Sequence, residues 1–335
     1  MAVTLKDVAE RAGVSTSAVS RTFTEGASVS HKTREKVEKA ASELGYSPNV
    51  LARSLTTRRT SLIGLIADNF QNPMFLEVFD QFTRSLQRRG LRPLIVNLSE
   101  ATEPETSVTM LQQYSVDGVI VASSTLPRTF VEAFRTAGIP VVHSVGRPSR
   151  APKVDVIGID NARCGAMAAE TLAARGYRRV GFLAGPQTAT STVDRARGFA
   201  NELAHHHQIE AETRFCDGYS YAAGYAAMRA EIKAGPREAY FCGDDIISIG
   251  ALSALRDAGL SVPGDVGLIG FNDMEMARWG VVDLTTIRQP LTEIIEASVA
   301  RIVSIVADPD QPPEAMTLPC ELIERGTLRP LPGDG

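Results

Sequence analysis

The sequence predicts an α/β protein in which a small all-helical segment precedes two doubly wound α/β halves. Short helical patterns with N-cap residues and glycine stops fill residues 1–46. From residue 61, short apolar runs alternate with amphipathic segments, and this alternation restarts near residue 160. Alternating strand and helix patterns are typical of parallel α/β sheets. A chain of 335 residues is long enough for two or three domains.

The charge of the chain is unevenly distributed. Hydrophobic residues make up 44% and charged residues 22%, as in ordinary folded proteins. The net charge is −4, but residues 1–60 carry ten basic and six acidic side chains, a balance of +4. The remaining residues carry 25 basic and 33 acidic side chains, a balance of −8. A basic head on an acidic body indicates that one end of the protein contacts a polyanion.

The cysteines and the N-terminus indicate in which cellular compartment the protein works. The four cysteines lie far apart in the sequence and form no C-x-x-C pair: Cys164, Cys216, Cys242 and Cys320. This pattern fits reduced thiols and excludes a short-spaced zinc site. The N-terminus lacks the apolar core of a signal peptide, and no apolar run approaches the ~20 residues that span a bilayer. We therefore expect a cytoplasmic protein with no membrane partner.

The first 46 residues predict three helices. A capping-box-like start at Thr4 begins the first helix, and Gly13 ends it. Ser15 is the expected N-cap of the second helix, and Ser30 that of a third, which Gly45 ends. Two short helices joined by a tight glycine-containing turn form a helix-turn-helix. The alternative interpretation is a three-helix protein-interaction module with a solvated face.

The second helix has a polar outer face that fits the major groove of DNA. This face consists of Thr16, Ser17, Ser20 and Arg21. Arg21 is the best candidate for a bidentate guanine contact, worth ~1–3 kcal/mol of discrimination. Phosphate contacts, which set position rather than sequence, are expected from Ser15, Ser20 and Thr33.

A short hinge helix is predicted after the three helices. Ser47-Pro48 is a good helix start because proline favours the first helical position. About two turns follow, with Ala52 and Leu55 on one side and Arg53 nearby. Such a helix is too short to be stable alone, so we expect it to order when a partner binds.

The N-terminal motifs carry a resemblance to a known family. The ordered blocks are T-L-K-D-V-A-E-R-A-G-V-S-x-x-x-V-S-R, V-S-x-x-T-R-E-K-V and L-G-Y-S-P-N-x-x-A-R-S-L. Together they resemble the headpiece and hinge of the LacI/GalR (lactose-repressor) family of bacterial transcription regulators. The resemblance implies that the base readers are Thr16, Ser17 and Arg21, with Leu5 beside them. It also implies that the hinge enters the minor groove through Asn49, Ala52 and Leu55.

The body shows the predicted strands and helices in two series. The first has strands at 62–66, 94–98, 118–121, 141–143 and 156–159 and helices around 75–89, 105–114, 128–137 and 162–175. The second has strands at 180–184, 214–217, 239–242 and 266–270 and helices around 192–206, 222–233 and 245–258. The stretch 284–290 is expected to cross back to the first half, followed by a helix at 291–307 and a strand near 316–323.

These patterns give four predicted parts. They are a helix-turn-helix headpiece (1–46), a hinge helix and linker (47–60), an effector N-subdomain (61–160 plus 290–320) and an effector C-subdomain (161–289 plus 321–330). Ligands of open α/β sheets bind at the carboxyl ends of the strands, so two facing halves predict a crevice between them.

The resemblance extends to the body, which is similar to the family's periplasmic-binding-protein-like effector domain. Segments such as Asp68–Phe75, Gly158–Asn161 and Phe241–Asp245 carry it. By position, it implies that the effector-cleft residues are Met74, Phe75, Ser191, Arg195, Tyr219, Asp244, Asn272 and Gln289. Arg195 would offer a donor fork to ligand oxygens, and the two aromatic rings would supply stacking faces.

Several positions depart from the family's pattern. Asn272 stands where the family usually has aspartate, which leaves the identity of the effector open. Further departures are Val145, Gly146, Ala189 and Val282. Trp279, the only tryptophan, either stacks on a sugar-like ring or is a rim or core aromatic.

Sequence signals for enzymes and metals are weak. His205-His206-His207 lacks a Cys/His partner at ligand spacing and is interpreted as a solvated helix end. Neither G-x-S-x-G, H-E-x-x-H, a Walker loop nor G-x-G-x-x-G after the first strand occurs, and Asp244-Asp245 has no second acid tied to it. We expect no enzyme activity, no cofactor and no metal.

Three functions compete for this chain: a ligand-responsive DNA-binding regulator, a solute-binding receptor and an α/β enzyme with an accessory module. A solute receptor would have a signal peptide and no headpiece, which is the opposite of this sequence. The resemblance implies a regulator, most often a repressor, that binds an inverted-repeat operator in double-stranded DNA as a homodimer, with a tetramer as the alternative. Its effector is a sugar, sugar acid, nucleoside or polyol, and whether that effector releases or recruits the protein is open.

Overall fold

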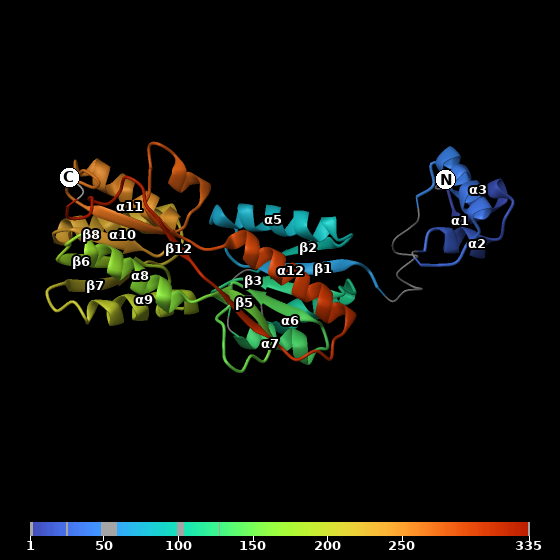
Figure 1. Cartoon of the computed structure of the whole chain (residues 1–335), viewed down its shortest axis with the longest axis horizontal. Coiled ribbons are helices and arrows are strands. Elements are labelled where there is room, and N and C mark those ends of the chain that lie inside the picture. The colour runs from blue at the N-terminus through green and yellow to red at the C-terminus, as the bar shows by residue number, and fades with distance from the viewer. Residues whose placement is uncertain (1–2, 25, 48–58, 99–103, 127, 334–335) are drawn as a thin grey trace. The chain divides into compact units, whose positions relative to one another are not determined.

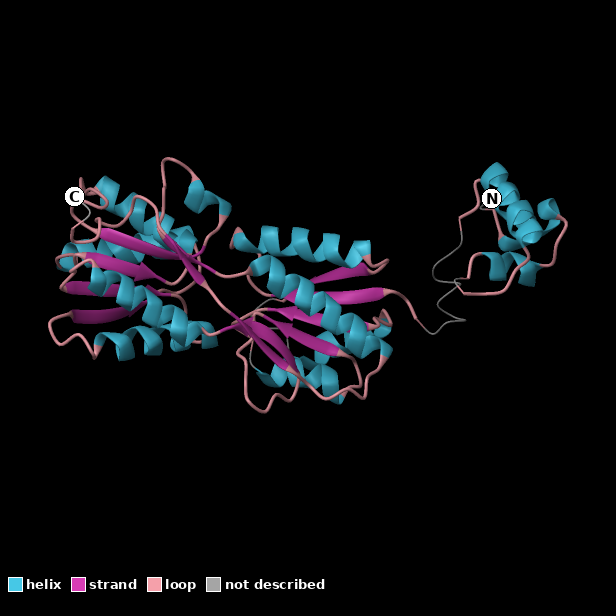
Figure 2. Cartoon of the chain, in the orientation of Figure 1, coloured by secondary structure: helices cyan, strands magenta, loops and turns pink. Residues whose placement is uncertain are grey.

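The computed structural model describes residues 3–24, 26–47, 59–98, 104–126 and 128–333. The chain divides into two compact units, residues 1–60 and 61–335. Figure 1 shows the elements in chain order, and Figure 2 shows that helices cover both faces of the sheets in the larger unit. The helix-turn-helix unit and the two α/β sheets confirm the predicted fold class.

The smaller unit has the three predicted helices, α1 (Leu5–Ala12), α2 (Thr16–Thr22) and α3 (His31–Leu44). Thr4 and Asp7 form a reciprocal capping box at the start of α1, with the Thr4 amide 2.7 Å from the Asp7 carboxylate. Ser15 and Ser30 cap α2 and α3 through backbone amides. Gly13 and Gly45 end α1 and α3 in the left-handed region, which glycine adopts without steric cost.

A small apolar core holds these helices together. Its buried members are Val8, Ala9, Val19, Val37, Ala40 and Ala41. Arg11 of α1 reinforces the packing with two hydrogen bonds, at 2.9 and 2.7 Å, to the Glu43 carboxylate of α3. Arg34 of α3 donates to the Thr22 carbonyl at the end of α2, at 2.9 Å. Helix α2 is therefore held by the apolar core on its inner face and by Arg34 at its C-terminal end. Its outer face is exposed to solvent.

The first half of the body, which we call the N-lobe, is built on a six-stranded parallel sheet. Its strands are β1 (Leu62–Ala67), β2 (Arg92–Asn97), β3 (Gly118–Ala122), β4 (Val141–Ser144), β5 (Asp155–Ile159) and β11 (Ala315–Leu318). The strand order is β11-β5-β4-β3-β1-β2. Its helices are α5 (Met74–Arg88), α6 (Pro104–Gln113), α7 (Arg128–Thr136) and α12 (Leu291–Ala307). Helix α12 packs against α5 and against β3, β4 and β5.

The second half, the C-lobe, repeats this topology. Its strands are β6 (Arg179–Ala184), β7 (Glu210–Phe215), β8 (Ala239–Cys242), β9 (Gly267–Asn272), β10 (Thr286–Arg288) and β12 (Glu321–Ile323). The order is β12-β10-β9-β8-β6-β7, with only the β10–β12 pair antiparallel among the described strands. Its helices are α8 (Asn161–Ala174), α9 (Thr190–Leu203), α10 (Tyr221–Ala234), α11 (Asp245–Asp257) and the 3₁₀ turn η1 (Glu275–Arg278).

Three expected elements differ in the structure. The strand expected at 214–217 is β7 at Glu210–Phe215, an exposed edge strand whose polar residues hide it from an apolar-run search. The single strand expected near 316–323 is two strands, β11 and β12, which belong to different sheets. The stretch 284–290 crosses between lobes as expected, but it first contributes β10 to the C-lobe sheet.

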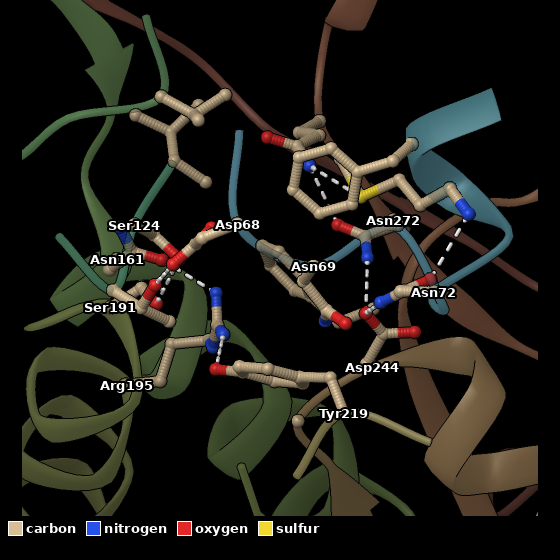
Figure 3. Close-up of a pocket in the computed structure, with 18 residues that line it drawn as sticks. Asp68, Asn69, Asn72, Ser124, Asn161, Ser191, Arg195, Tyr219, Asp244 and Asn272 are labelled. Carbon is tan, nitrogen blue, oxygen red and sulfur yellow. Dashed lines mark hydrogen bonds between the residues drawn. The ribbon is translucent and has the colours of Figure 1, made fainter. Parts of the chain in front are cut away.

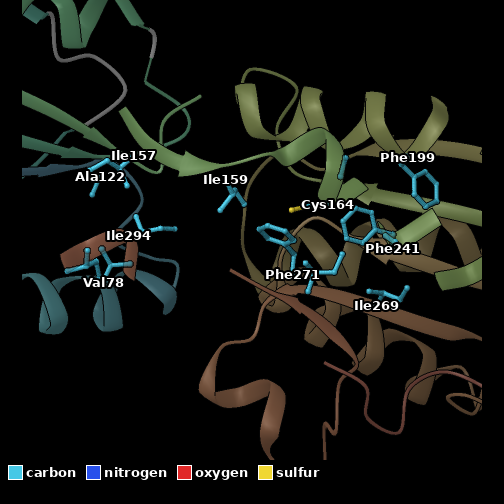
Figure 4. Close-up of a cluster of buried hydrophobic side chains, with 14 of the residues drawn as sticks. Val78, Ala122, Ile157, Ile159, Cys164, Phe199, Phe241, Ile269, Phe271 and Ile294 are labelled. Atoms are coloured by element: carbon cyan, nitrogen blue, oxygen red, sulfur yellow. The ribbon is translucent and has the colours of Figure 1, made fainter. Parts of the chain in front are cut away.

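In the part of the chain that the structure describes, the backbone passes between the lobes three times. These passages, which we call the hinge crossovers, are Ile159–Asn161, Arg288–Leu291 and Leu318–Glu321. One cluster of buried side chains extends from the N-lobe through this region into the C-lobe, and Figure 4 shows Ile159, Cys164 and Phe271 within it. The hinge crossovers therefore lie against a packed apolar core.

Candidate functional site

The predicted DNA-reading side chains of α2 are exposed. Thr16, Ser17, Ser20 and Arg21 all face solvent. Positions four apart share one face of a helix, and Arg21 Nε donates to the Ser17 carbonyl at 3.3 Å. Within the described part of the headpiece, no other hydrogen bond or ion pair holds the Arg21 side chain. Its guanidinium is therefore available to a base edge.

Other residues predicted to contact DNA also form contacts within the headpiece. Ser15 and Thr33 sit at the starts of α2 and α3, where the Ser15 hydroxyl lies 2.9 Å from the Ser17 hydroxyl and the Thr33 hydroxyl 2.8 Å from that of Ser30. Leu5 is half-buried against the headpiece core. The predicted hinge contacts lie outside the described residues: Asn49, Ala52, Arg53 and Leu55.

The body contains a pocket lined by both lobes, shown in Figure 3. All eight residues predicted for the effector cleft line it: Met74, Phe75, Ser191, Arg195, Tyr219, Asp244, Asn272 and Gln289. Together with the solvent at its mouth, the pocket encloses about 590 Å³, within the size range of small-molecule sites. The sequence-predicted cleft residues thus meet at one place.

The topology explains why these residues meet. Asp68 follows β1, Ser124 follows β3 and Val145 follows β4, so the N-lobe contributes the carboxyl ends of its parallel strands. Asp244 follows β8 and Asn272 ends β9, so the C-lobe contributes in the same way. Loops at the carboxyl ends of strands are where open α/β sheets hold their ligands.

Arg195 is the buried cation of the pocket. Its two terminal nitrogens donate to Asn161 Oδ1 at 2.7 Å and to the Tyr219 hydroxyl at 3.0 Å. Its guanidinium lies over the Phe271 ring, 4.2 Å from the centroid. Its Nε is buried and has no hydrogen-bond partner among the described residues. A buried donor without a partner is costly, so this group favours a ligand acceptor in the pocket.

The position of Arg195 depends on close packing of α8 against α9. A Cβ at Gly165 of α8 would collide with the Arg195 carbonyl of α9, and a Cβ at Gly198 would collide with Ala162. Glycine at these two positions lets the helices approach closely. The approach brings Asn161, at the start of α8, within reach of the guanidinium.

Asp244 is the centre of an amide network opposite Arg195. Its carboxylate accepts from Asn72 at 2.9 Å, from Asn272 at 3.0 Å and from the Ile246 amide at 2.8 Å. Gln289 in turn donates to Asn272 Oδ1 at 2.6 Å. Burial raises the pKa of Asp244 to about 6, although these hydrogen bonds and Arg195 oppose the rise. The pocket thus contains a buried carboxyl group whose pKa lies well above that of an ordinary aspartate.

A second carboxyl group comes from the N-lobe. Asp68 accepts a hydrogen bond from the Thr125 hydroxyl, and burial raises its pKa above the ordinary value.

Strained backbone conformations also occur at the pocket, because Val145, Asn272 and Asp273 have φ values of 56°, 110° and 58°. Such conformations are costly for residues other than glycine and cluster at ligand sites. Asp273 is held by Arg278, Arg288 and Arg325, which fixes the loop that carries Asn272.

Sequence reasoning missed ten lining residues. They are Asp68, Asn69, Asn72, Ser124, Thr125, Val145, Ile159, Asn161, Gly243 and Phe271. A usable signal existed for the polar ones, since each lies a few residues after the end of a predicted strand. Trp279 does not line the pocket and is half-exposed, so the rim interpretation holds over ring stacking in the cleft. Asp245 turns away from the pocket and accepts hydrogen bonds from Thr286 and the Met274 amide instead.

Two family models match the chain. Residues 4–49 match the model described as bacterial regulatory proteins, lacI family, and residues 169–328 match a periplasmic binding protein-like domain. The chain is 33% identical over 332 residues to the HTH-type transcriptional repressor PurR of Escherichia coli O139:H28, with 97% of this chain and 96% of that protein covered. The PurR of Klebsiella pneumoniae is 32% identical over the same length, with the same coverage.

The chain belongs to the lacI family of bacterial regulatory proteins. It is a DNA-binding transcription regulator and not an enzyme, as the sequence predicted, because its matched relatives are transcriptional repressors.

Solved structures agree with this assignment. The lac repressor dimer bound to operator and the anti-inducer ONPF has a TM-score of 0.87 and 27% identity, covering 98% of this chain and all of that one. The complex of the transcriptional regulator CelR with cellobiose has a TM-score of 0.72 and 29% identity, covering 97% and 99%. A lacI-family regulator from Silicibacter pomeroyi has a TM-score of 0.78 and 29% identity, covering 98% and 100%.

Membrane spans and metal clusters are both missing from the described residues. None of the helices there combines the length and apolarity needed to cross a bilayer. No group of three or more His, Cys, Asp or Glu side chains in the same part of the chain is arranged to hold a metal ion.

Proposed function

We propose that this regulator is a repressor that binds an inverted-repeat operator as a homodimer and that a small polar molecule in the pocket between its lobes controls its DNA affinity. The observation that carries the proposal is Arg195, a buried guanidinium on the pocket wall whose Nε lacks a partner within the described chain. The similarity over nearly the whole chain to repressors of one family supports the DNA-binding part.

The pocket favours a hydroxyl-rich effector. Arg195 needs an acceptor, while the carboxylates of Asp68 and Asp244 accept from hydroxyl groups. Phe75 supplies an apolar face on the N-lobe side. Sugars, sugar acids, nucleosides and polyols all combine hydroxyl groups with a compact ring or chain. The eight predicted cleft residues are accordingly proposed as effector contacts.

The effector would act by changing the contacts between lobes. Hydrogen bonds between described residues of the two lobes near the pocket include Asn72 with Asp244 at 2.9 Å, Ser124 with Ser191 at 3.1 Å and Arg147 with Asp194 at 2.5 Å. A ligand that inserts among these pairs must replace some of them, which alters the preferred angle between lobes. We propose that the segment 47–60 transmits this change to the headpiece. A coupling of ~1–3 kcal/mol would alter operator affinity about 5–150-fold.

The proposed dimer has a candidate surface on the body. Leu76 on α5 is 77% exposed and Trp279 is 50% exposed, and both line one shallow groove with Met276. Large exposed apolar side chains that gather in one place mark interaction surfaces. Two bodies paired there would carry two headpieces, as an inverted repeat requires. Sedimentation of Leu76→Glu should give a monomer, whereas an unchanged dimer would reject this surface.

A matched pair of variants tests the effector site. A thermal-shift screen with sugars, sugar acids, nucleosides and polyols should first identify a ligand that raises the Tm. Arg195→Ala should then lose the ligand shift while retaining DNA binding. Arg197→Ala, two residues along α9 and outside the pocket lining, should keep the shift. A full ligand response in Arg195→Ala would refute the proposed site.

A further inference from the structure

Val145, which follows β4, lines the pocket in an unusual backbone conformation. It is one of the positions that depart from the family's pattern. Its φ of 56° lies in the left-handed region. Few residues adopt this region, and for a β-branched side chain such as valine it is a clear outlier. Outliers of this kind persist only where the surrounding structure holds them, and they cluster at ligand sites.

Close packing holds the backbone of Val145 in place. The Val145 amide donates to the Ile157 carbonyl of β5 at 2.7 Å. The next residue, Gly146, is buried between His143 and Gly158. A Cβ at Gly146 would collide with the His143 ring, and a Cβ at Gly158 would collide with the Gly146 carbonyl. These two positions therefore accept only glycine while the ring stays where it is.

The His143 ring cannot move aside without breaking a hydrogen bond. The side chain is buried, and its Nε2 lies 2.7 Å from the Ser123 carbonyl oxygen. Because a carbonyl oxygen only accepts, Nε2 carries the hydrogen and donates it. The Ser123 hydroxyl in turn accepts from the amides of Thr125 and Leu126, each at 3.1 Å. The ring therefore supports both the Val145 segment and the loop after β3.

The polar side chains of the loop after β3 already have partners within the protein. The Ser124 hydroxyl accepts from the Ser191 hydroxyl at 3.1 Å, and the Thr125 hydroxyl donates to Asp68. Figure 3 shows Asp68, Ser124 and Ser191 together on one side of the pocket. A ligand hydroxyl placed here would compete with these hydrogen bonds.

We propose, building on the proposed effector site, that Val145 determines which effector the pocket accepts: with Ile159 it forms an apolar wall that selects a deoxy sugar. Ile159 ends the neighbouring strand β5 and also lines the pocket. A deoxy sugar has a methyl or methylene group where its parent sugar has a hydroxyl. A hydroxyl against this wall loses its water without gaining a hydrogen bond, which disfavours the parent sugar. The other hydroxyl groups of the ring remain available to Asp244 and Arg195.

Three matched pairs of sugars test this selection on the full-length protein by isothermal titration calorimetry. The pairs are L-rhamnose with L-mannose, L-fucose with L-galactose, and deoxyribose with ribose, and each pair differs by one hydroxyl. At least one deoxy sugar should bind about tenfold or more tightly than its parent, within the range expected for a hydroxyl in an apolar pocket. Val145→Asn, which places an amide on the wall, should abolish or reverse this preference. The control Val193→Asn changes a valine on α9 that is 41% exposed and outside the pocket lining, and it should keep the preference.

The outcomes separate this proposal from the effector site itself. Equal affinities within every pair, or no binding of any of the three deoxy sugars, would overturn the apolar selection. A parent sugar that binds at least as tightly as its deoxy form, and that Arg195→Ala no longer binds, would overturn the selection but support the effector site. Sugar binding that persists in Arg195→Ala would count against both.

Urea unfolding separates a role in binding from a role in stability. Asparagine tolerates the left-handed region better than valine, and glycine adopts it without steric cost. Val145→Asn and Val145→Gly both relieve the strain, so at least one of them should unfold at a urea midpoint no lower than that of the wild type. Lower midpoints in both variants would show that valine is kept for stability and would overturn the proposed role in binding.

Discussion

The carboxyl group of Asp244 makes the stability of the body depend on pH in an unusual direction. Burial raises its pKa from the ordinary 3.8 to about 6. Because the folded protein then binds its proton more tightly than the unfolded chain does, this group stabilises the fold at low pH. The contribution is complete below the unfolded pKa near 3.8 and is lost as the pH rises through 6. Substitution by asparagine removes this dependence.

The size of the effect follows from the interval between the two pKa values. At about 1.4 kcal/mol per pKa unit, the rise from 3.8 to about 6 corresponds to a total loss of about 3 kcal/mol. The asparagine in the Asp244→Asn variant would place an amide donor against the donors of Asn72 and Asn272. This unfavourable contact between donors lowers the free energy of unfolding of the variant by the same amount at every pH. The change in stability with pH can therefore still be compared between wild type and variant.

Urea unfolding of wild type and Asp244→Asn between about pH 4.5 and pH 7.5 measures the effect. The wild type should lose about 2 kcal/mol more than the variant across this range. Asp265→Asn is a control of opposite sign, because hydrogen bonds from Ser261 lower the pKa of Asp265, whose stabilisation is lost as pH falls. Parallel curves for wild type and Asp244→Asn would refute the reasoning.

Three further predictions concern the headpiece, the predicted hinge helix in the segment 47–60 and the core of the body. Arg21→Ala should weaken specific DNA binding by ~1–3 kcal/mol in a fluorescence anisotropy titration, while equal loss on all sequences would reject base reading. Leu55→Ala should reduce operator bending in a gel-phasing assay, and unchanged bending would reject the minor-groove wedge. Phe241 stacks on Phe182 at 4.6 Å and lies near Phe199, so Phe241→Ala should cost about 3–5 kcal/mol in urea unfolding. A cost below about 1 kcal/mol would show that the core collapses around the lost ring.

Local signals predicted most elements of the fold. The helix at 291–307 and the strand at 239–242 agree with α12 and β8 to the residue, because apolar runs of fixed length are bounded by proline, glycine and acidic caps. The sequence analysis placed strand β7 at 214–217 instead of Glu210–Phe215. It did so because β7 is an edge strand in which Glu210 and Glu212 face solvent, so its first residues form no apolar run. Pro319 lies between β11 and β12, but the sequence carried no indication that the two would join different sheets.

The candidate-site residues that were predicted are those whose position in the family decides their identity. Arg195 and Asp244 were found in this way, and both line the pocket. The contacts of Arg195 with Phe271 and Asn161 depend on helix packing and sheet order, which local patterns do not encode. Asn72 was missed for the same reason, since its bond to Asp244 joins opposite lobes.

The most direct test of the central claim compares DNA affinities with and without a pocket ligand. The full-length protein is titrated onto a duplex that it has selected from a random library and onto a scrambled duplex, at roughly physiological salt. The account predicts a palindromic consensus, a preference of at least about 10³ over the scrambled duplex, and a change of at least about fivefold with the ligand from the thermal-shift screen. Equal affinity for both duplexes, or affinity indifferent to a ligand that occupies the pocket, would contradict it.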